Sequence, residues 1–312
     1  MAAQEATASG LQVNVPDNRI TVIVNGASGA AAKAGDGLTD RLAAAFAKTG
    51  TNAEIRIVEG DAIADAVRAA SAKGRIVVAG GDGTIAAAVQ ALAGIDCELA
   101  LLPLGTLNHL ARDLGIPGNL EEAAALAVSG TARRIDVGMV NDRRFVNNAS
   151  IGLYPSMVRN RDALRERHGW PKWFATLPAA GQVLHELRAH RMRIDRGEGK
   201  QRVAGPLLFV GNNRYALDAG KVGRRASLSE GLLSVFVVAE RSRAALIWFG
   251  LRAIVGRADP DADFVALGDC TAMTVEIEDG PIEIALDGEL RELASPLRFA
   301  VLPGALAVVC PA

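Results

Sequence analysis

Apolar and polar positions follow two different rhythms along this chain, and the change comes near residue 134. In the first part, short apolar runs alternate with helical stretches of about 10 to 15 residues. The expected strands are 19–25, 53–59, 75–80 and 98–102, and the expected helices are 38–50, 61–73, 85–92 and 119–130. This alternation predicts a doubly wound α/β domain, a parallel sheet flanked by helices, with ligands at the carboxyl ends of the strands.

From Arg134 onward the pattern changes to strands of alternating polarity that are joined by turn residues. The expected strands are 134–140, 143–152, 190–196, 205–213, 231–240, 271–279, 281–289, 297–303 and 306–311. They predict a second, mainly antiparallel β domain of the sandwich type, interrupted by helical insertions at about 156–190 and 242–257.

The predicted domain organisation follows from this change of pattern. Residues 1–18 form a loose tail, and residues 19–134 together with the final strands of 292–312 form the α/β domain. Residues 135–291 form the β-sandwich domain.

Composition narrows the classes of protein that remain. The chain has 312 residues, half of them hydrophobic, and a net charge of −1, so no overall positive field points to nucleic acid. Its three cysteines are far apart and favour buried free thiols. The tail lacks the pattern of a signal peptide, and no apolar run is long enough to span a membrane. We therefore expect a cytoplasmic protein that can contact the inner membrane surface.

The stretch Gly80-Gly81-Asp82-Gly83-Thr84 lies between an apolar strand and an Ala-rich helix. Glycines before a helix N-terminus leave backbone N–H groups open to a phosphate, and the helix dipole favours the negative charge. Asp82 is unusual there, because a carboxylate beside phosphates fits best with Mg²⁺ between them, or with a lysine, arginine or water to position. The alternative is a plain turn in which Asp82 caps the helix.

Several short motifs follow one another in a fixed order: NGASG after the first strand, GGDGT, GTLNHLARDLGIP, NNASIGLYP, SEGLLSV and LDGE. In this order they resemble the diacylglycerol kinase catalytic family, the bacterial lipid kinases related to sphingosine and ceramide kinases. The resemblance runs from Ile20 to the end of the chain. It implies two domains that enclose a cleft: a nucleotide-binding domain of residues 19–134 with 292–312, and a lipid-substrate domain of residues 135–291. It also implies an ATP- and Mg²⁺-dependent transfer of phosphate to a lipid hydroxyl.

The resemblance also implies a nucleotide site. Its residues would be Asn25, Ser28, Gly29, Gly80, Gly81, Asp82, Gly83, Thr84, Thr106 and Asn108. Two positions depart from the family pattern: Gly26 replaces the proline of NPxSG, and His109 replaces the aspartate of GTxND. A lone histidine there is interpreted as a cap or a packed side chain.

Leu286-Asp287-Gly288-Glu289 resembles the family's DGE motif. Phosphoryl transfer to an alcohol needs a base near the hydroxyl proton and positive charge near the γ-phosphate. The resemblance implies Glu289 as the base, with Asp287 as its partner or as a ligand in the Mg²⁺ network and Asp82 as the third catalytic residue. In isolation, Asp-Gly is a common turn.

Ser227 to Gly231 occupy the place of a family segment that binds a structural Mg²⁺. Ser229 and Glu230 replace its two acids. The Glu230 carboxylate and the carbonyl groups of Ser227 and Leu232 could still provide oxygen ligands. Glu230 as a simple turn residue is the alternative.

The segment 159–202 has eleven Arg or Lys against five Asp or Glu, with Trp170, Trp173 and Phe174 near its centre. Basic residues beside interfacial aromatics suit an anionic membrane surface. The alternative is a solvated helix pair whose aromatics pack on the sandwich. The helix around Trp248 and Phe249 is expected in the core or lining the substrate site.

The combined prediction is a lipid kinase that phosphorylates a diacylglycerol-like or sphingoid-like substrate with ATP and Mg²⁺ in the cleft between its domains. An NAD kinase, which also has a GGDGT-like loop, is the nearest enzymatic alternative. A kinase-like protein that binds nucleotide or lipid without catalysis is the other. The identity of the lipid, the nucleotide preference and the oligomeric state do not follow from the sequence.

Overall fold

The structure is a computed structural model, and it describes residues 19–26, 37–152, 190–215, 225–238, 265–278 and 282–312. The chain divides into two compact units. Unit 1 consists of Met1–Arg133 and Ala307–Ala312, and unit 2 consists of Arg134–Leu306.

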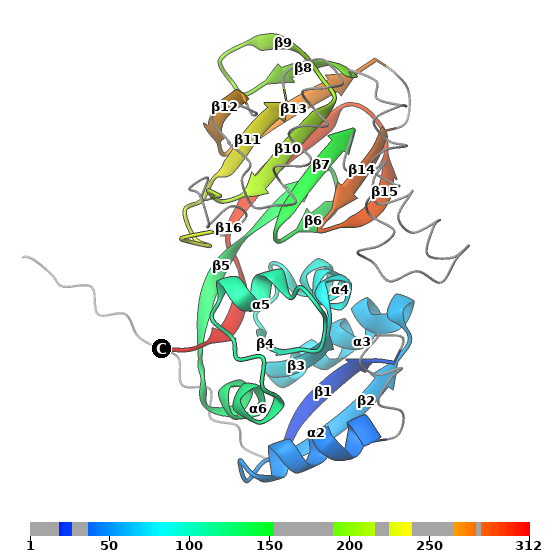
Figure 1. The fold of residues 1–312 in the computed structure, drawn as a ribbon, viewed down its shortest axis with the longest axis vertical. Helices are drawn as coiled ribbons and strands as arrows, with labels where there is room; N and C mark the ends of the chain where they lie inside the picture. The colour runs from blue at the N-terminus through cyan, green and yellow to red at the C-terminus, as the bar shows by residue number, and fades with distance from the viewer. Residues whose placement is uncertain (1–18, 27–36, 153–189, 216–224, 239–264, 279–281) are drawn as a thin grey trace, which may run out of the picture. The chain divides into compact units, whose positions relative to one another are not determined.

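Unit 1 contains the alternating strands and helices that the hydrophobic pattern predicts (Figure 1). Its elements are β1 (Arg19–Asn25), α2 (Gly37–Ala47), β2 (Asn52–Val58), α3 (Ile63–Ala70), β3 (Arg75–Gly80), α4 (Asp82–Leu92), β4 (Glu98–Pro103), α5 (His109–Asp113) and α6 (Leu120–Ser129). Short 3-10 turns at Gly60–Ala62 and Ser71–Lys73 flank α3, where the sequence predicted one longer helix.

The strands of unit 1 form a parallel sheet in the order β2-β1-β3-β4, and the end of β16 (Leu297–Cys310) pairs with β4 through Ala307 and Val308. Helices α2 and α6 pack on one face of this sheet, where Val22, Val24 and Phe46 belong to one buried cluster. Helices α3 and α4 pack against each other. Because the strands are parallel, β1, β3 and β4 all end at the same edge, and the predicted ligand loops follow them there.

Unit 2 is a sandwich of antiparallel strands. One sheet has the order β12-β11-β10-β7-β14-β15, and β16, β13, β8 and β9 are neighbours in the other layer, with β5 and β6 beside β16. The strands are β5 (Thr131–Val140), β6 (Arg143–Phe145), β7 (Asn148–Gly152), β8 (His190–Asp195), β9 (Lys200–Gly205), β10 (Leu207–Asn212), β11 (Leu233–Val238), β12 (Val265–Cys270), β13 (Ala272–Ile277), β14 (Ile282–Leu286) and β15 (Glu289–Leu293).

The core of unit 2 lies between these two layers. Side chains such as Ile151, Val210 and Val235 from one layer share a buried cluster with Met192, Val275 and other residues of the second. The predicted fold class, a doubly wound α/β domain followed by a mainly antiparallel β-sandwich, is confirmed.

Three details differ from the predicted strands. The stretch 143–152 is two strands, β6 and β7, separated by Val146 and Asn147. Residues 297–310 form one continuous strand instead of two. The strands β9, β12 and β15 were not predicted, and β9 and β15 are mostly exposed, so they lack the polar and apolar alternation on which the prediction depends.

Candidate functional site

The glycine loop of unit 1 has the geometry of an anion-binding site. Strand β3 ends at Gly80 and α4 begins at Asp82, with Gly81 in extended conformation as the N-cap residue. Because glycine has no side chain, the N-cap residue does not cap the first N–H groups of α4, and these groups remain suited to a phosphate. A Cβ atom at Gly80 would lie 2.5 Å from the side chain of Thr84, so this close turn requires glycine.

Asn25 connects the end of β1 to the same turn. Its side-chain amide Nδ2 donates a hydrogen bond of 2.9 Å to Oγ1 of Thr84, which is buried in the first turn of α4. The loop that follows β1 begins beside this contact. Gly26 leads into that loop, and Ser28 and Gly29, which were predicted to bind nucleotide, lie outside the described residues.

Asp82 joins the glycine loop to the loop after β4. Its two carboxylate oxygens accept hydrogen bonds from the backbone N–H groups of Asn108 (2.9 Å) and His109 (2.7 Å). These groups belong to the N-terminus of α5, where Asn108 has a left-handed conformation with φ of 47°. Asp82 therefore caps a helix on a neighbouring loop, whereas the plain-turn interpretation had it capping its own helix.

The two loops also touch through glycines. A Cβ atom at Gly105 would lie 2.6 Å from Cα of Gly81, so only glycine fits at this contact. The Asn108 side chain holds Gly105 from the other side, because its Oδ1 accepts from the Gly105 N–H and its Nδ2 donates to the Gly105 carbonyl. Of the predicted nucleotide-binding residues, the structure thus brings together Asn25, Gly80, Gly81, Asp82, Gly83, Thr84 and Asn108 at one edge of the sheet.

The remaining residues of the second loop are exposed. Thr106 lies on the surface beside Leu107, whose side chain is 55% exposed. The His109 residue is exposed too, so the interpretation of its side chain as packed is wrong. Asp82 binds the backbone of His109, and the bond is therefore available to any residue at that position except proline.

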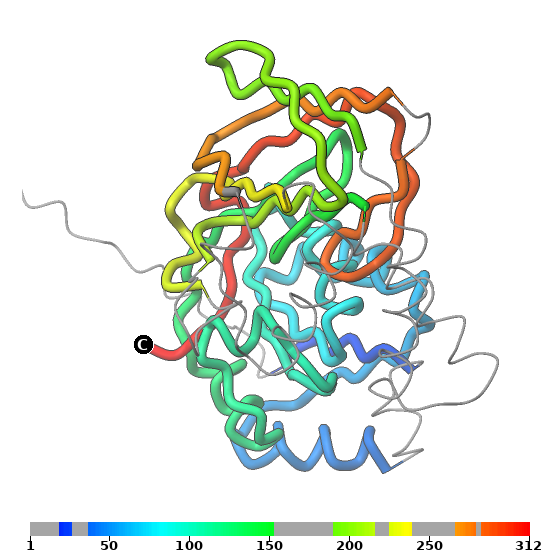
Figure 2. The backbone as a smooth tube through the Cα atoms, turned by 45° about the horizontal axis from the view of Figure 1, so that its top comes forward, coloured from blue at the N-terminus to red at the C-terminus, as the bar shows by residue number. Residues whose placement is uncertain are grey.

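Strands β14 and β15 form a hairpin in unit 2, which is orange in Figure 2. Asp287 and Gly288 form its tight turn, because Leu286 pairs with Glu289. Both have positive φ, 49° and 86°, as a two-residue type I′ turn requires. The Asp287 carboxylate accepts hydrogen bonds from the backbone N–H groups of Val146, Asn147 and Asn148, at 2.7 to 3.1 Å. These three bonds account for the break between β6 and β7.

Burial raises the pKa of Asp287 to about 6, although the three backbone N–H groups and the charge of Arg225 act in the opposite direction. Arg225 is itself 6% exposed, and its guanidinium donates to the carbonyl groups of Val146 and Asn212 and to Oδ1 of Asn147. Arg225 was not predicted as a site residue. Nothing in the sequence around it distinguishes it from the other arginines.

Glu289, the predicted base, begins β15 next to this turn. Its side chain is 41% exposed and forms an ion pair of 2.7 Å with Arg291 on the same strand. The DGE turn therefore holds one carboxylate inside a backbone cage and leaves the other accessible.

The predicted metal ligands lie together in one loop of unit 2, and all of them offer oxygen atoms. Oε2 of Glu230 accepts from the Arg214 N–H at 3.2 Å, and the Leu232 carbonyl accepts from the Asn213 N–H at 2.9 Å. The Ser227 hydroxyl accepts from the N–H of Ser229. Mg²⁺ takes oxygen ligands of these kinds, so the residue types fit. Only one of the three residues carries charge, and no cluster of three acidic, His or Cys residues occurs within the described part of the chain.

Asp136 supports this loop and was not predicted. It is 2% exposed, and its two carboxylate oxygens accept from the N–H groups of Gly231 (2.7 Å) and Gly304 (2.8 Å). Its own N–H donates to the Leu228 carbonyl. The loop 227–232 is thus bound to the strands β5 and β16 through one buried carboxylate.

The predicted membrane-contacting segment is described only in part. Trp170, Trp173 and Phe174, and also Trp248 and Phe249, lie outside the described residues. Two basic residues near the end of the segment pair with acids of the sheet: Arg193 with Glu278 at 2.7 Å and Lys200 with Glu276 at 2.8 Å. In the part of the chain that the structure covers, no helix combines the length and apolar composition needed to cross a bilayer.

Comparison with known proteins shows the family to which this chain belongs. Residues 19–140 match the model of the diacylglycerol kinase catalytic domain, and residues 161–310 match that of the YegS C-terminal NAD kinase beta sandwich-like domain. The class of protein is therefore the lipid kinases, phosphotransferases with an alcohol group as acceptor. The chain belongs to the diacylglycerol kinase family that includes the YegS-like lipid kinases.

Individual relatives agree with this assignment. The chain is 31% identical to a diacylglycerol kinase of Mycobacterium tuberculosis over 94% of its own length and 95% of the relative's. It is 33% identical to a Pseudomonas aeruginosa protein named "Probable lipid kinase YegS-like", over 76% of each chain. The crystal structure of a diacylglycerol kinase from Bacillus anthracis shares the fold, with a TM-score of 0.65, 22% identity and coverage of 94% and 97%.

Proposed function

We propose that this lipid kinase transfers the γ-phosphate of ATP to a hydroxyl group of a diacylglycerol-like or sphingoid-like lipid, with Mg²⁺ as the required cation. One observation carries the nucleotide part of the proposal. Asp82 binds the loops after β3 and β4 together beside an α4 N-terminus whose N-cap residue is glycine. That arrangement favours a polyphosphate, because backbone N–H groups and the helix dipole both favour anions.

Each part of the proposed site has its own role in binding or catalysis. The glycine loop and the Asn25–Thr84 pair hold the phosphates, while Thr106 and Asn108 contact the nucleotide from the next loop. Glu289 accepts the proton of the lipid hydroxyl, for which its exposed carboxylate is suited. Asp287 positions Glu289 by holding the turn.

Mg²⁺ would neutralise charge on the transferring phosphate when it is bound. Asp82, on the glycine loop, is the carboxylate that we expect to lie nearest to the bound phosphates and their Mg²⁺. Glu230, with the carbonyl groups of Ser227 and Leu232, is proposed as a separate structural Mg²⁺ site in unit 2. With one charged ligand this second site would bind the cation weakly.

The departures from the family pattern favour an active enzyme over a non-catalytic relative. Asp82 accepts a hydrogen bond from the backbone N–H of His109, and this bond does not require the aspartate that the family has at position 109. At Gly26, a Cβ atom would lie 2.9 Å from Cγ2 of Ile57, so glycine accommodates the isoleucine of this chain. The contact between the glycine loop and the loop after β4 therefore does not depend on the side chain at position 109.

The test is a transfer assay with ATP labelled in its γ-phosphate, Mg²⁺ and a mixed lipid extract, in which the product is identified by mass. We expect a phosphorylated lipid and ATP consumption that depends on lipid. Nucleotide binding without turnover on a broad lipid panel would instead support a binding protein.

An NAD kinase activity is the second candidate, because the matched model of the C-terminal domain is described as NAD kinase beta sandwich-like. The same assay with NAD in place of lipid vesicles separates the two activities. Formation of NADP at a rate above that of lipid phosphate would replace the lipid kinase proposal.

A further inference from the structure

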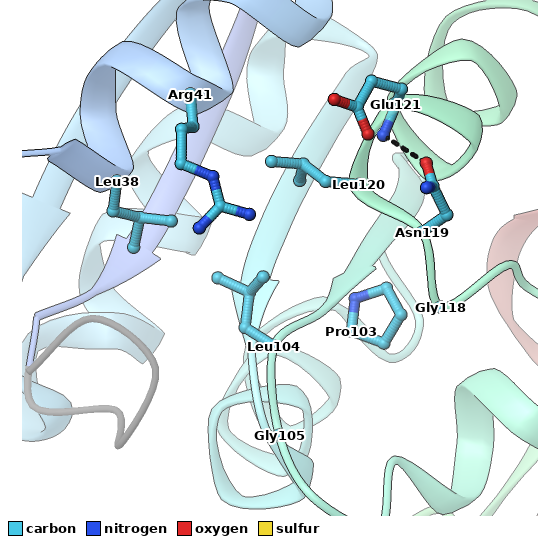
Figure 3. A pocket seen from close by; sticks show the side chains of 9 residues that line it. All are labelled: Leu38, Arg41, Pro103, Leu104, Gly105, Gly118, Asn119, Leu120 and Glu121. Atoms are coloured by element: carbon cyan, nitrogen blue, oxygen red, sulfur yellow. Dashed lines mark hydrogen bonds between the residues drawn. The ribbon is translucent and has the colours of Figure 1, made fainter. Parts of the chain in front are cut away.

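The nucleotide part and the DGE turn of the proposed site are supported in different ways. In unit 1, a cavity of about 390 Å³ borders the glycine loop, because Gly105 lines the cavity and packs against Gly81 (Figure 3). In unit 2, the segment between β6 and β7 that binds Asp287 is backed by Arg225, which is 6% exposed. The DGE turn is therefore supported from inside unit 2 by a buried cation.

Arg225 binds the segment between β6 and β7 with both terminal nitrogens of its guanidinium. Nη1 donates to the carbonyl groups of Val146 (2.5 Å) and Asn212 (3.3 Å), and Nη2 donates to Oδ1 of Asn147 (2.8 Å). The ring centre of Tyr215 lies 5.6 Å from the guanidinium carbon, within the range of a cation–π contact. Contacts from separate segments of the chain thus fix the guanidinium in one position.

The residues that Arg225 binds also hold the Asp287 carboxylate. The backbone N–H groups of Val146 and Asn147 donate to Asp287 at 2.8 and 2.7 Å. Each of these two residues therefore has its N–H on Asp287 and an oxygen atom on Arg225. Because Asp287 lies in the turn that precedes Glu289, a shift of the segment between β6 and β7 would also move the predicted base.

Asn212 restrains the same segment from β10, and its residue is fully buried. Its Nδ2 donates to the carbonyl groups of Val146 (3.0 Å) and Asp136 (2.8 Å), and its backbone N–H donates to the Asn147 carbonyl at 2.9 Å. The Val146 carbonyl thus accepts from both Arg225 and Asn212. A buried polar network of this kind is rigid, so the segment has little freedom to shift.

We propose that Arg225 is a positioning residue for phosphoryl transfer, which holds the segment between β6 and β7 so that the Asp287 turn keeps Glu289 at the lipid hydroxyl. The inference rests on the proposed function, because it takes Glu289 as the base. It adds a residue that is buried and that none of the sequence motifs contains. Because burial of a charged side chain costs stability, packing alone is a weak reason for an arginine at this place.

Two substitutions break the link between Arg225 and the turn. Arg225→Lys keeps the positive charge but replaces two donor nitrogens by one, so it cannot reproduce the bonds to both Val146 and Asn147. Asn147→Ala removes one acceptor and leaves the backbone N–H that binds Asp287 in place. Arg193→Lys is the matched control, because Arg193 is an exposed arginine of β8 in the same unit.

The experiment measures kcat and both KM values for lipid phosphorylation well below the melting temperature of each variant, together with the dissociation constant of ATP. We expect Arg225→Lys to lower kcat by about tenfold or more, because a general base is worth about 100-fold or more and a small displacement loses part of this. Both KM values and ATP binding should stay within about twofold of the parent, since substrate binding does not depend on the base.

Asn147→Ala should lower kcat in the same way, and it provides the test if Arg225→Lys does not fold. The double variant should be no slower than Arg225→Lys within about twofold, because both substitutions break one link. The control Arg193→Lys should keep the parent's kcat.

A structural role alone gives a different result, in which the melting temperature falls while kcat below it equals the parent's. That result overturns the proposal, as do additive losses in the double variant or a kcat that excess Mg²⁺ restores, which would assign the effect to the loop 227–232. In all these cases a parent that phosphorylates lipid and loses this activity in Glu289→Ala keeps the proposed function. A parent without lipid phosphorylation contradicts the proposed function itself.

Discussion

The two aspartates at 82 and 287 use the same kind of contact in very different surroundings. Each accepts hydrogen bonds from backbone N–H groups of a distant segment, two for Asp82 and three for Asp287. Asp82 lies in a glycine loop next to an open helix N-terminus, whereas Asp287 is enclosed by a polar cage that includes the buried Arg225. The first site can therefore bind an anion, and the second serves to hold a turn.

This difference suggests that the three predicted catalytic acids contribute unequally to stability and to activity. Asp287 should matter most for the free energy of unfolding, Asp82 should matter for both, and Glu289 should matter almost only for turnover. The following experiments test that order, beginning with the largest expected change in stability.

Asp287→Ala should lower the free energy of unfolding by about 3–5 kcal/mol, because it leaves the backbone N–H groups of three residues without their acceptor. Thermal or urea unfolding followed by circular dichroism measures this change. Glu292→Ala, which removes an exposed acid of β15, is the control. A loss no larger than that of the control would show that the cage is not a structural element.

The free energy of unfolding should depend on pH, because the pKa of Asp287 differs between the folded and unfolded states. Its pKa is raised from 3.8 to about 6 in the folded chain, so the folded state holds the proton more tightly than the unfolded state. Stability from this group is fully present below about pH 4 and falls by at most about 3 kcal/mol as the pH rises to about 6.

Unfolding in urea at several pH values across this window measures the slope. Asp287→Asn should flatten it, because an amide does not titrate. A slope that is the same in parent and variant would assign the titration to other groups.

Asp82→Ala should cost about 2 kcal/mol, since two backbone N–H groups at the N-terminus of α5 lose their acceptor. Turnover should fall below detection, because the same carboxylate fixes the loop on which the nucleotide depends. Asp82→Asn keeps one acceptor oxygen and should recover part of the stability. If Asp82→Ala is as stable as the parent, the Asp82 carboxylate does not hold the two loops together.

Glu289→Ala should change the free energy of unfolding by less than about 0.5 kcal/mol, because only an exposed ion pair with Arg291 is lost. The rate of lipid phosphorylation should nevertheless fall by about 100-fold or more, as expected for removal of a general base. Arg291→Ala breaks the same ion pair and serves as the control. If both variants keep the parent's rate, the base is another residue.

Part of this description could be predicted from residues alone. The runs RITVIVN and RIVVAG are apolar on both faces, as buried parallel strands require, and the loops after them therefore lie at one edge of a sheet. The motifs NGASG, GGDGT and GTLN could be located for the same reason, because they follow the ends of β1, β3 and β4. The strand β15 could not be predicted, since its exposed residues ELREL carry no alternation.

The partners of the acids were beyond prediction for a different reason. Asp82 contacts residues 26 and 27 positions further along the chain, and Asp287 contacts residues about 140 positions before it. In each case the partner is a backbone N–H group, which every residue except proline possesses. No side-chain pattern can mark such a partner.

The sequence by itself determined the order of strands and helices, the place of the glycine loop and the family, because hydrophobic period and glycine content are local properties. Only the tertiary structure decided which backbone groups Asp82, Asp136 and Asp287 bind, and that Arg225 is buried among them. It alone revealed the cavity beside Gly105 as well, because a cavity depends on how separate helices pack. Local patterns specify the elements, while long-range contacts between groups common to all residues appear only after folding.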